Sequence, residues 1–255
     1  MTDLPTKIRA RLSTMSKYSI VLLIIFCISF AYRVLLPYES VFTGDSVIFG
    51  GNDPWYHLRL VENLLQHFPH RIAFDPFTLF PFGQNVPWPP FFDLLLGSLI
   101  WVIGLGSPTQ HTIETVGAYF PAILGALVTV PVYFIGRELF NRNVGLLAAA
   151  LIAILPGQFL IRSLLGFTDH HVTEVLFSTT AALFLILAIK RAKDKDISFG
   201  HIRSRDWGKI KKPLIYALLA GFALGIYLLM WNGALLFIFM IIAYTTIQCL
   251  SLIHI

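Results

Sequence analysis

The sequence predicts an all-α polytopic membrane protein with a long, partly helical first external loop. Hydrophobic residues make up 56% of the 255 residues and charged residues 13%, whereas about a quarter of an ordinary soluble domain is charged. Apolar runs long enough to cross a bilayer recur along the chain. Basic residues cluster beside these runs, and one polar stretch between two of them is far longer than a simple connector.

The net charge of +5 does not indicate a nucleic-acid partner. The basic residues stand next to apolar runs, where they orient a chain in the membrane instead of forming a phosphate-binding patch. We therefore expect membrane lipids, and no nucleic acid, as partners. Cys27 and Cys249 lie in separate apolar segments, so they predict neither a disulfide framework nor a cysteine metal site.

The first apolar run, 18–36, follows a short basic segment, 1–17. At about 19 residues it is long enough to cross the hydrocarbon core. No small-residue cleavage motif follows it, which separates it from a signal peptide. We predict a retained anchor helix over 18–36 and a cytoplasmic N-terminus over 1–17.

The next apolar run, 91–105, is ambiguous. It contains Asp93 and has about 15 residues, whereas a span needs about 20. The later runs are clearer, and they cover 118–136, 144–160, 175–190, 214–230 and 233–247.

Loop charge resolves the ambiguity. If 91–105 does not span, the basic N-terminus, the turn at 137–142 and the basic loop 190–212 all lie on the cytoplasmic side, as the positive-inside rule requires. We therefore predict six spans, the first over 18–36 and five more within 116–249. The first external loop, 37–115, and the second, 161–174, then share the outer face.

The first external loop is long enough to have a fold of its own. Asn52-Asp53-Pro54 is typical of a helix start, because proline suits the first helical position. Apolar residues follow at spacings of three or four, which predicts an amphipathic helix: Trp55, Leu58, Val61, Leu65 and Phe68. Prolines and glycines then predict an irregular segment over 75–90.

Two clusters of polar residues lie beside the predicted spans, one over 50–57 and one over 162–174. Acidic and imidazole groups are costly near a membrane, so they indicate function. Asp169 and His171 are two residues apart, so in an extended loop they could hold one divalent ion. Short clusters of this kind are more often solvated turns, and Asp53 before Pro54 is equally typical of a helix N-cap.

The other polar residues also allow two interpretations. His57 and Arg59 fit the polar face of the loop helix. Arg162 is the only basic residue of the second loop, so it can pair with Asp53 or Asp169, or meet a phosphate. Glu174 begins a span, where a carboxylate favours the positive helix end.

Three stretches resemble the STT3-type catalytic subunits of oligosaccharyltransferases, in the form typical of the archaeal AglB enzymes. One stretch is similar to the first acidic motif of that family, and another to its second motif, whose Asp-x-Asp appears as Asp-x-His in archaeal members. The stretches are Gly51-Asn52-Asp53-Pro54-Trp55-Tyr56-His57-Leu58-Arg59, Arg162-Ser163 with Gly166-Phe167-Thr168-Asp169-His170-His171, and Tyr227-Leu228-Leu229-Met230-Trp231-Asn232-Gly233.

The resemblance implies a GT-C glycosyltransferase transmembrane core in the cell membrane, with its active site on the extracellular face. It implies transfer of an oligosaccharide from a dolichol-type phosphate or pyrophosphate carrier to the asparagine of an N-x-S/T sequon, with inversion at the sugar. The expected partners are the lipid-linked oligosaccharide and the acceptor polypeptide.

The resemblance also implies roles for single residues. Asp53 and Asp169 would be catalytic, and Asp53, Asp169 and His171 would bind Mn²⁺ or Mg²⁺. The ion would neutralise the leaving phosphate, while Asp53 would accept a hydrogen bond from the carboxamide and so activate its nitrogen. Substrate binding or orientation of the site would fall to His57, Arg59, Arg162, His170 and Glu174.

Features of the family are missing from this chain: a later glutamate loop, a Trp-Trp-Asp motif and a soluble C-terminal domain. The last residues, 250–255, resemble a translated sequencing adapter. We therefore expect an N-terminal fragment with a foreign tail, and we expect this fragment alone to lack transferase activity.

Other functions compete with this hypothesis. A secondary transporter also carries acids, but it concentrates them near the middle of the membrane. A protein O-mannosyltransferase-like GT-C enzyme also has acids in its first outer loop, although Asp169-His170-His171 favours the oligosaccharyltransferase. A catalytically inactive homologue is the third alternative.

Overall fold

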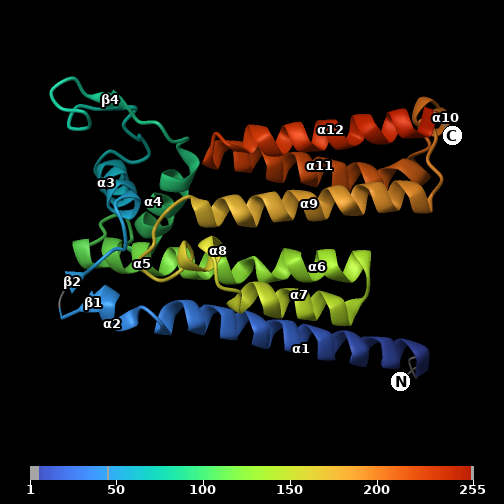
Figure 1. Ribbon diagram of the computed structural model, residues 1–255, viewed down its shortest axis with the longest axis horizontal. Coiled ribbons are helices and arrows are strands. Elements are labelled where there is room, and N and C mark those ends of the chain that lie inside the picture. The colour runs from blue at the N-terminus through green and yellow to red at the C-terminus, as the bar shows by residue number, and fades with distance from the viewer. Residues whose placement is uncertain (1–5, 45, 254–255) are drawn as a thin grey trace.

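Long helices lie side by side in the computed structural model, and short loop elements gather at one end of them (Figure 1). The structure describes residues 6–44 and 46–253, so part of the predicted segments 1–17 and 250–255 lies outside the described residues. The long row consists of α1 (Thr6–Leu35), α5 (Gln110–Leu127), α6 (Thr129–Leu139), α7 (Arg142–Ile154), α9 (His171–Asp194), α11 (Trp207–Met230) and α12 (Ala234–Ile253).

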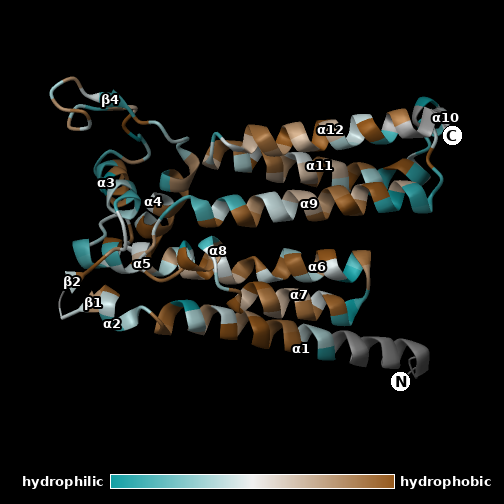
Figure 2. Cartoon of the chain, viewed as in Figure 1, coloured by the Kyte–Doolittle hydropathy of each residue, from teal (hydrophilic) through white to brown (hydrophobic). Residues whose placement is uncertain are grey.

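Length and hydropathy mark this row as membrane-embedded. Within the described residues, four helical stretches are long and apolar enough to cross a bilayer, namely Lys17–Leu35, Gln110–Leu139, His171–Asp194 and Trp207–Met230. Figure 2 shows hydrophobic residues along the middle of the helices and hydrophilic residues towards their ends. Large apolar side chains such as Leu23 and Phe222 are exposed, as lipid contact requires. The predicted all-α polytopic fold is confirmed.

The helix boundaries differ from the apolar runs. α7 ends at Ile154, six residues before the end of the predicted run 144–160, because Pro156 and Gly157, with φ +151°, interrupt the helix. A separate short helix, α8 (Gln158–Ile161), follows. α9 begins at His171, whereas the sequence places the start of this span at residue 175. The second loop therefore covers 155–170 and not 161–174.

Both chain ends lie at the end of the row opposite the loop elements (Figure 1). The turn between α6 and α7 and the connection that contains α10 (Phe199–Arg203) lie at that same end. The basic segments 137–142 and 190–212 are thus on the side of the N-terminus. Which side of the membrane each end faces stays a prediction.

The first loop contains four short strands and several helices. α2 (Tyr38–Val41) leads into the antiparallel pair β1 (Phe42–Thr43) and β2 (Ser46–Val47), and a second pair joins β3 (Phe74–Asp75) to β4 (Gln84–Asn85). α3 (Asp53–Gln66) buries one face, and α4 (Phe91–Ile103) lies among these elements, not in the row of long helices. The ambiguous run 91–105 is therefore a short helix at the loop end.

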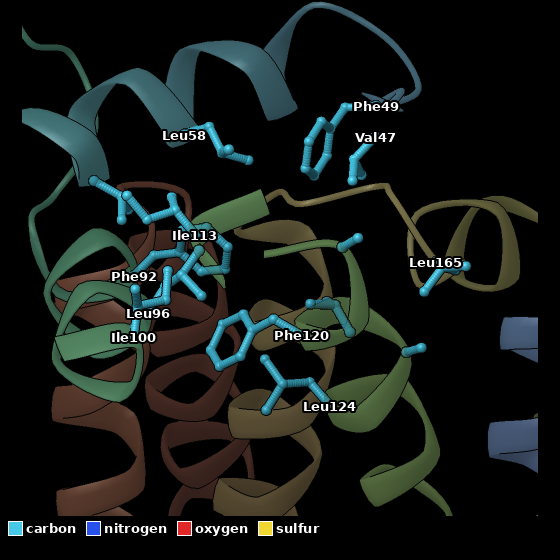
Figure 3. Close-up of a cluster of buried hydrophobic side chains, with 14 of the residues drawn as sticks. Val47, Phe49, Leu58, Phe92, Leu96, Ile100, Ile113, Phe120, Leu124 and Leu165 are labelled. Carbon is cyan, nitrogen blue, oxygen red and sulfur yellow. The ribbon is translucent and has the colours of Figure 1, made fainter. Parts of the chain in front are cut away.

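One apolar cluster joins both loops to the bundle. Figure 3 shows Phe49 and Leu58 of the first loop above side chains of α4 and α5, with Leu165 of the second loop beside them. Burying an apolar side chain of this size contributes about 1.5–3 kcal/mol. The labelled members are Val47, Phe49, Leu58, Phe92, Leu96, Ile100, Ile113, Phe120, Leu124 and Leu165.

A buried arginine ties the second loop to α1. The Arg33 side chain is fully buried, and no ion pair joins it to any acid within residues 6–44 and 46–253. Its guanidinium donates hydrogen bonds to Ser163 Oγ at 2.9 Å and to the Ala153 carbonyl at 2.8 Å. Its own carbonyl accepts from the Leu165 amide. Arg33 therefore holds the loop between α7 and α9 by hydrogen bonds and by a cation–π contact with the Phe159 ring, whose centroid lies 5.2 Å from the guanidinium carbon.

Gly125 of α5 lets this arginine approach. A Cβ at this position would lie 2.6 Å from both Arg33 Nε and Ser163 Cβ, and overpacking of this kind costs about 1–3 kcal/mol. We expect Gly125→Ala to lower the midpoint of thermal unfolding in detergent. Gly221→Ala in α11 is the matched control, because a Cβ there meets nothing within 4 Å. Equal midpoints for the two variants would contradict the close packing.

Candidate active site

The second polar motif lies in the loop that precedes α9 and rests on α5. The Gly166 amide donates to the Ala118 carbonyl at 2.9 Å, and Thr168 Oγ1 donates to the Gly117 carbonyl at 2.8 Å. Gly166 has φ +78°, a conformation that favours glycine. These contacts fix the backbone directly before Asp169.

The first polar motif packs against the second. The Gly50 amide donates to the Gly166 carbonyl at 3.1 Å, and the ring of Phe167 lies against Gly50 and Gly51. The two predicted clusters, far apart in sequence, are therefore in direct contact at the loop end of the bundle. α3 begins immediately after this contact and carries His57 towards the second motif.

Asp169 lies at the centre of the polar cluster and is fully buried. Its Oδ1 atom lies 2.7 Å from His170 Nδ1 and 3.5 Å from His57 Nε2. Its Oδ2 atom accepts from Arg162 Nη1 at 3.1 Å and lies 3.5 Å from His171 Nε2. The sequence left two carboxylate partners open for Arg162, and Asp169 is the one it contacts.

The segment around Asp169 and His171 is not extended, although the metal site predicted from their spacing requires an extended loop. His170 has helical angles, φ −63° and ψ −19°, and His171 is the first residue of α9. One helical turn then brings Glu174 to His171, with 2.5 Å between Oε1 and Nδ1. The helix start therefore explains why these groups meet.

Charge in this cluster is strongly coupled. Burial opposes the charged form of His57, but the carboxylates of Asp169 and Asp93 outweigh it and raise the pKa of His57 to about 9. Burial likewise opposes the charge on Asp169, yet His170 and His57 hold the pKa of this carboxyl well below its usual range. At neutral pH the cluster thus contains a buried anion beside a buried cation.

Several potential metal ligands face one another in this cluster. Asp169 Oδ1 and Glu174 Oε1 are buried and each has a close imidazole neighbour, at 2.7 Å and 2.5 Å respectively, whereas the buried His170 Nε2 makes no hydrogen bond within the part of the chain that the structure describes. The ligand atoms of two groups lie within 4.8 Å of one another: His57, Asp169 and His170, and His170, His171 and Glu174. Carboxylate oxygens and imidazole nitrogens form a donor set that fits a divalent ion.

Other predicted site residues lie elsewhere or in a different role. Asp53 is exposed in the first turn of α3, where Asn52 holds the cap position and makes no side-chain cap hydrogen bond, so the N-cap interpretation of Asp53 is wrong. Arg59 pairs with Asp75 at 3.0 Å and, among the described residues, forms no ion pair with the acids of the buried cluster. His57 is fully buried, so its placement on the polar face of the helix is also wrong.

The third resembling stretch reaches the same place. The ring of Trp231 lies 6.4 Å from that of His171, and Asn232 Nδ2 donates to the Pro87 carbonyl of the first loop at 3.3 Å. The family profile described as "Oligosaccharyl transferase STT3, N-terminal" matches residues 22–254. The chain belongs to the STT3 family.

Archaeal glycotransferases are among the relatives of this STT3 chain. Dolichyl-phosphooligosaccharide-protein glycotransferase 3 of Archaeoglobus fulgidus is 41% identical over 224 residues, which cover 88% of this chain and 24% of that protein. Dolichyl-monophosphooligosaccharide–protein glycotransferase AglB of Haloferax volcanii is 34% identical over 241 residues, 93% of this chain and 23% of its own length. The chain thus spans about a quarter of the length of these curated relatives.

Solved structures show the same fold. Archaeoglobus fulgidus AglB in complex with an inhibitory peptide and a dolichol-phosphate matches with a TM-score of 0.80 and 38% identity, over 91% of this chain and 25% of that chain. The oligosaccharyltransferase of the same organism with zinc and sulfate gives 0.76 and 40%, over 88% and 26%. These matches confirm the resemblance to the STT3/AglB family and the predicted fold class.

Sequence reasoning missed two charged residues of this STT3 site. Asp93 of α4 is fully buried and accepts from His57 Nδ1 at 2.6 Å. Arg71, from the segment between α3 and β3, lies 2.7 Å from Asp93. The signal in the sequence is an acid inside the apolar run 91–105, a position that is costly for a carboxylate unless it has a partner.

The junction of the two motifs depends on Gly166. A Cβ there would lie 2.8 Å from Val41 Cγ2 and 3.3 Å from the Ile48 carbonyl. We expect Gly166→Ala to push the loops apart, break the Gly50–Gly166 hydrogen bond and speed amide hydrogen exchange around Gly50.

Gly44→Ala separates this clash from backbone strain, because Gly44 also has a positive φ, +61°, but a Cβ there meets nothing within 4 Å. Hydrogen-exchange mass spectrometry of peptides covering residues 47–52 compares the variants. Unchanged exchange in Gly166→Ala would show that the two loops are held together without this contact.

Proposed function

We propose that this chain is the N-terminal part of an oligosaccharyltransferase that transfers an oligosaccharide from a dolichol-type phosphate or pyrophosphate carrier to the asparagine of N-x-S/T sequons. The observation that carries the proposal is the meeting of two polar motifs in one buried cluster around Asp169. A cluster of acids, imidazoles and one arginine fits the chemistry of a phosphate leaving group.

The relatives support this choice of substrates. One solved structure of Archaeoglobus fulgidus AglB contains a dolichol-phosphate and an inhibitory peptide, and another oligosaccharyltransferase structure is tethered to an acceptor peptide containing the NVT sequon. We infer that the whole protein to which this chain belongs binds a lipid-linked oligosaccharide and an acceptor polypeptide.

The residues suggest a divalent ion, and we propose Mn²⁺ or Mg²⁺. Asp53, Asp169 and His171 remain the proposed ligands, and His170 and Glu174 offer further ligand atoms in the same cluster. A bound ion of this kind supplies Lewis-acid stabilisation to a leaving phosphate. The relative solved with zinc and sulfate is consistent with cation and anion binding in this family.

The exposed and the buried residues of the site can have different roles in the reaction. Arg162 pairs with Asp169 while 33% of its side chain stays exposed, so its guanidinium can also reach a phosphate. Asp53 is exposed at the start of α3, where its carboxylate can accept a hydrogen bond from the NH₂ of an acceptor asparagine. Loosening the conjugation of the acceptor amide makes its nitrogen a better nucleophile. We propose that this nitrogen attacks the sugar, displaces the carrier phosphate and inverts the configuration at the sugar.

We infer that the site faces the outside of the cell membrane. The basic segments 137–142 and 190–212 lie at the end of the bundle that holds the N-terminus, and the positive-inside rule assigns this end to the cytoplasm. The buried acids of the described residues, Asp75, Asp93 and Asp169, lie in loops or in α4 and not along the long helices. This distribution disfavours an ion-coupled transporter.

Removal of either proposed catalytic carboxylate should nearly abolish glycosylation. We expect Asp53→Ala and Asp169→Ala in the full-length enzyme to lower the transfer rate to a sequon peptide at least about 100-fold, since each removes charge stabilisation in the transition state. Glu62→Ala is the control, because Glu62 lies at the far end of α3 and contacts Gln110. Near-normal turnover in Asp53→Ala or Asp169→Ala would remove that residue from the proposed site.

Metal removal gives an independent test. We expect EDTA to stop transfer by the full-length enzyme and excess Mn²⁺ or Mg²⁺ to restore it, because the carboxylates then regain their counter-charge. Peptide glycosylation measured against the free ion concentration provides the readout. Full activity after exhaustive chelation would refute metal dependence.

A further inference from the structure

We infer that Asp93, His57 and Arg71 form a positioning relay, which holds Asp169 and His170 in the orientation needed to bind a divalent ion. The inference rests on the metal dependence of the proposed function. It assigns a role to an acid and an arginine that neither polar motif contains.

The relay begins with a buried carboxylate that must be paired. Asp93 is fully buried in the apolar helix α4, where an isolated charge would be very costly. Its Oδ1 atom accepts from His57 Nδ1 at 2.6 Å, because a carboxylate can only accept. Its Oδ2 atom lies 2.7 Å from Arg71 Nε. Each carboxylate oxygen thus has its own positively charged neighbour.

Arg71 is itself held in place. It is largely buried, with 9% of its side chain exposed, and its Nη1 atom donates to the Trp88 carbonyl at 3.3 Å. Arg71 thus gives the buried Asp93 a positively charged partner beside the imidazole that donates to it. The Arg71 guanidinium therefore contacts both Asp93 of α4 and Trp88 of the segment that leads into α4.

His57 connects Asp93 to the second motif. Its Nε2 atom lies 3.1 Å from His170 Nδ1 and 3.5 Å from Asp169 Oδ1. Aromatic rings enclose the imidazole, with ring centroids at 4.8 Å for Phe92 and 5.4 Å for Trp88. The fixed Nδ1 and the surrounding rings together prevent the imidazole from turning away from Asp169.

The relay ends at candidate ligand atoms. His57 contacts Asp169 through Oδ1 and His170 through Nδ1. His170 Nε2, on the other edge of that imidazole, is buried and makes no hydrogen bond to the described residues, and Asp169 Oδ2 lies near Arg162 and His171. Partners that orient metal ligands through contacts outside the metal site typically change metal affinity by about 10- to 100-fold. We therefore expect the atoms that His57 does not contact, His170 Nε2 and Asp169 Oδ2, to be the ones that bind the ion.

Asp75 and Arg59 provide a matched comparison in the same loop. Asp75 is 1% exposed, and it pairs with Arg59 at 3.0 Å, as Asp93 pairs with Arg71. The Phe77 amide also donates to Asp75, and within the described residues no hydrogen bond or ion pair joins Asp75 or Arg59 to His57 or Asp169. The two acids share burial and an arginine partner but differ in access to the candidate metal site.

The decisive experiment measures Mn²⁺ binding by the full-length enzyme with electron paramagnetic resonance, alongside peptide glycosylation. We expect Asp93→Asn to raise the Mn²⁺ dissociation constant about 10- to 100-fold, with most of kcat recovered at saturating Mn²⁺. Asp75→Asn should leave the dissociation constant within about twofold of the wild type. Asp75 shares no partner with the candidate metal ligands, and substitutions at residues without shared partners act independently.

A double variant tests whether Asp93 acts through His57. We expect His57→Gln to weaken Mn²⁺ binding at least as much as Asp93→Asn, and the double variant to bind no more weakly than His57→Gln alone, because the relay is already broken. Thermal unfolding in EDTA checks that each variant is folded, and His57→Gln provides the comparison if Asp93→Asn does not fold.

The outcomes separate this inference from the proposed function. A wild-type enzyme that neither binds nor needs a divalent ion overturns the metal-dependent function and the relay with it. A wild type that binds Mn²⁺, beside a folded Asp93→Asn with the same dissociation constant and a lower unfolding midpoint, makes Asp93 a structural residue only and leaves the proposed function standing. Equal weakening by Asp75→Asn also overturns the relay.

Discussion

The loop end of this protein depends on the burial of opposite charges between two segments that are distant in sequence. His57 of α3 and His170 before α9 are 113 residues apart, and both contact the fully buried Asp169. Separating the loops would take His57 away from the buried Asp169, and breaking a buried pair of this kind is strongly destabilising. This constraint holds the first loop over the second.

The membrane helices supply the surface on which this charge cluster rests. α5 contributes carbonyls of Gly117 and Ala118 to the second loop, and Leu58 of α3 packs over Gly117. At the neighbouring face of α5, Gly125 leaves room for Arg33 to hold the start of the same loop. One helix therefore serves both loops, so their relative position follows from the bundle.

The buried and exposed members of the site complement each other. Asp169 and His57 are enclosed, which favours a fixed geometry over direct access, whereas Asp53 and part of Arg162 face outward. Such a division is typical of sites in which charged groups are held in advance in the orientation that the reaction needs. The Asp93 and Arg71 pair extends this fixed side away from the substrate.

The sequence by itself determined the features that depend on local pattern. Hydropathy predicted the membrane helices, Pro54 marked the start of α3, and the motifs identified the family, because each signal lies within one short stretch. Only the tertiary structure decided that His57 is buried, that Asp93 contacts it and that Arg59 turns to Asp75 instead. Burial depends on which distant segments pack together. The periodicity of one helix predicts which of its faces is apolar but does not specify which segments pack against it.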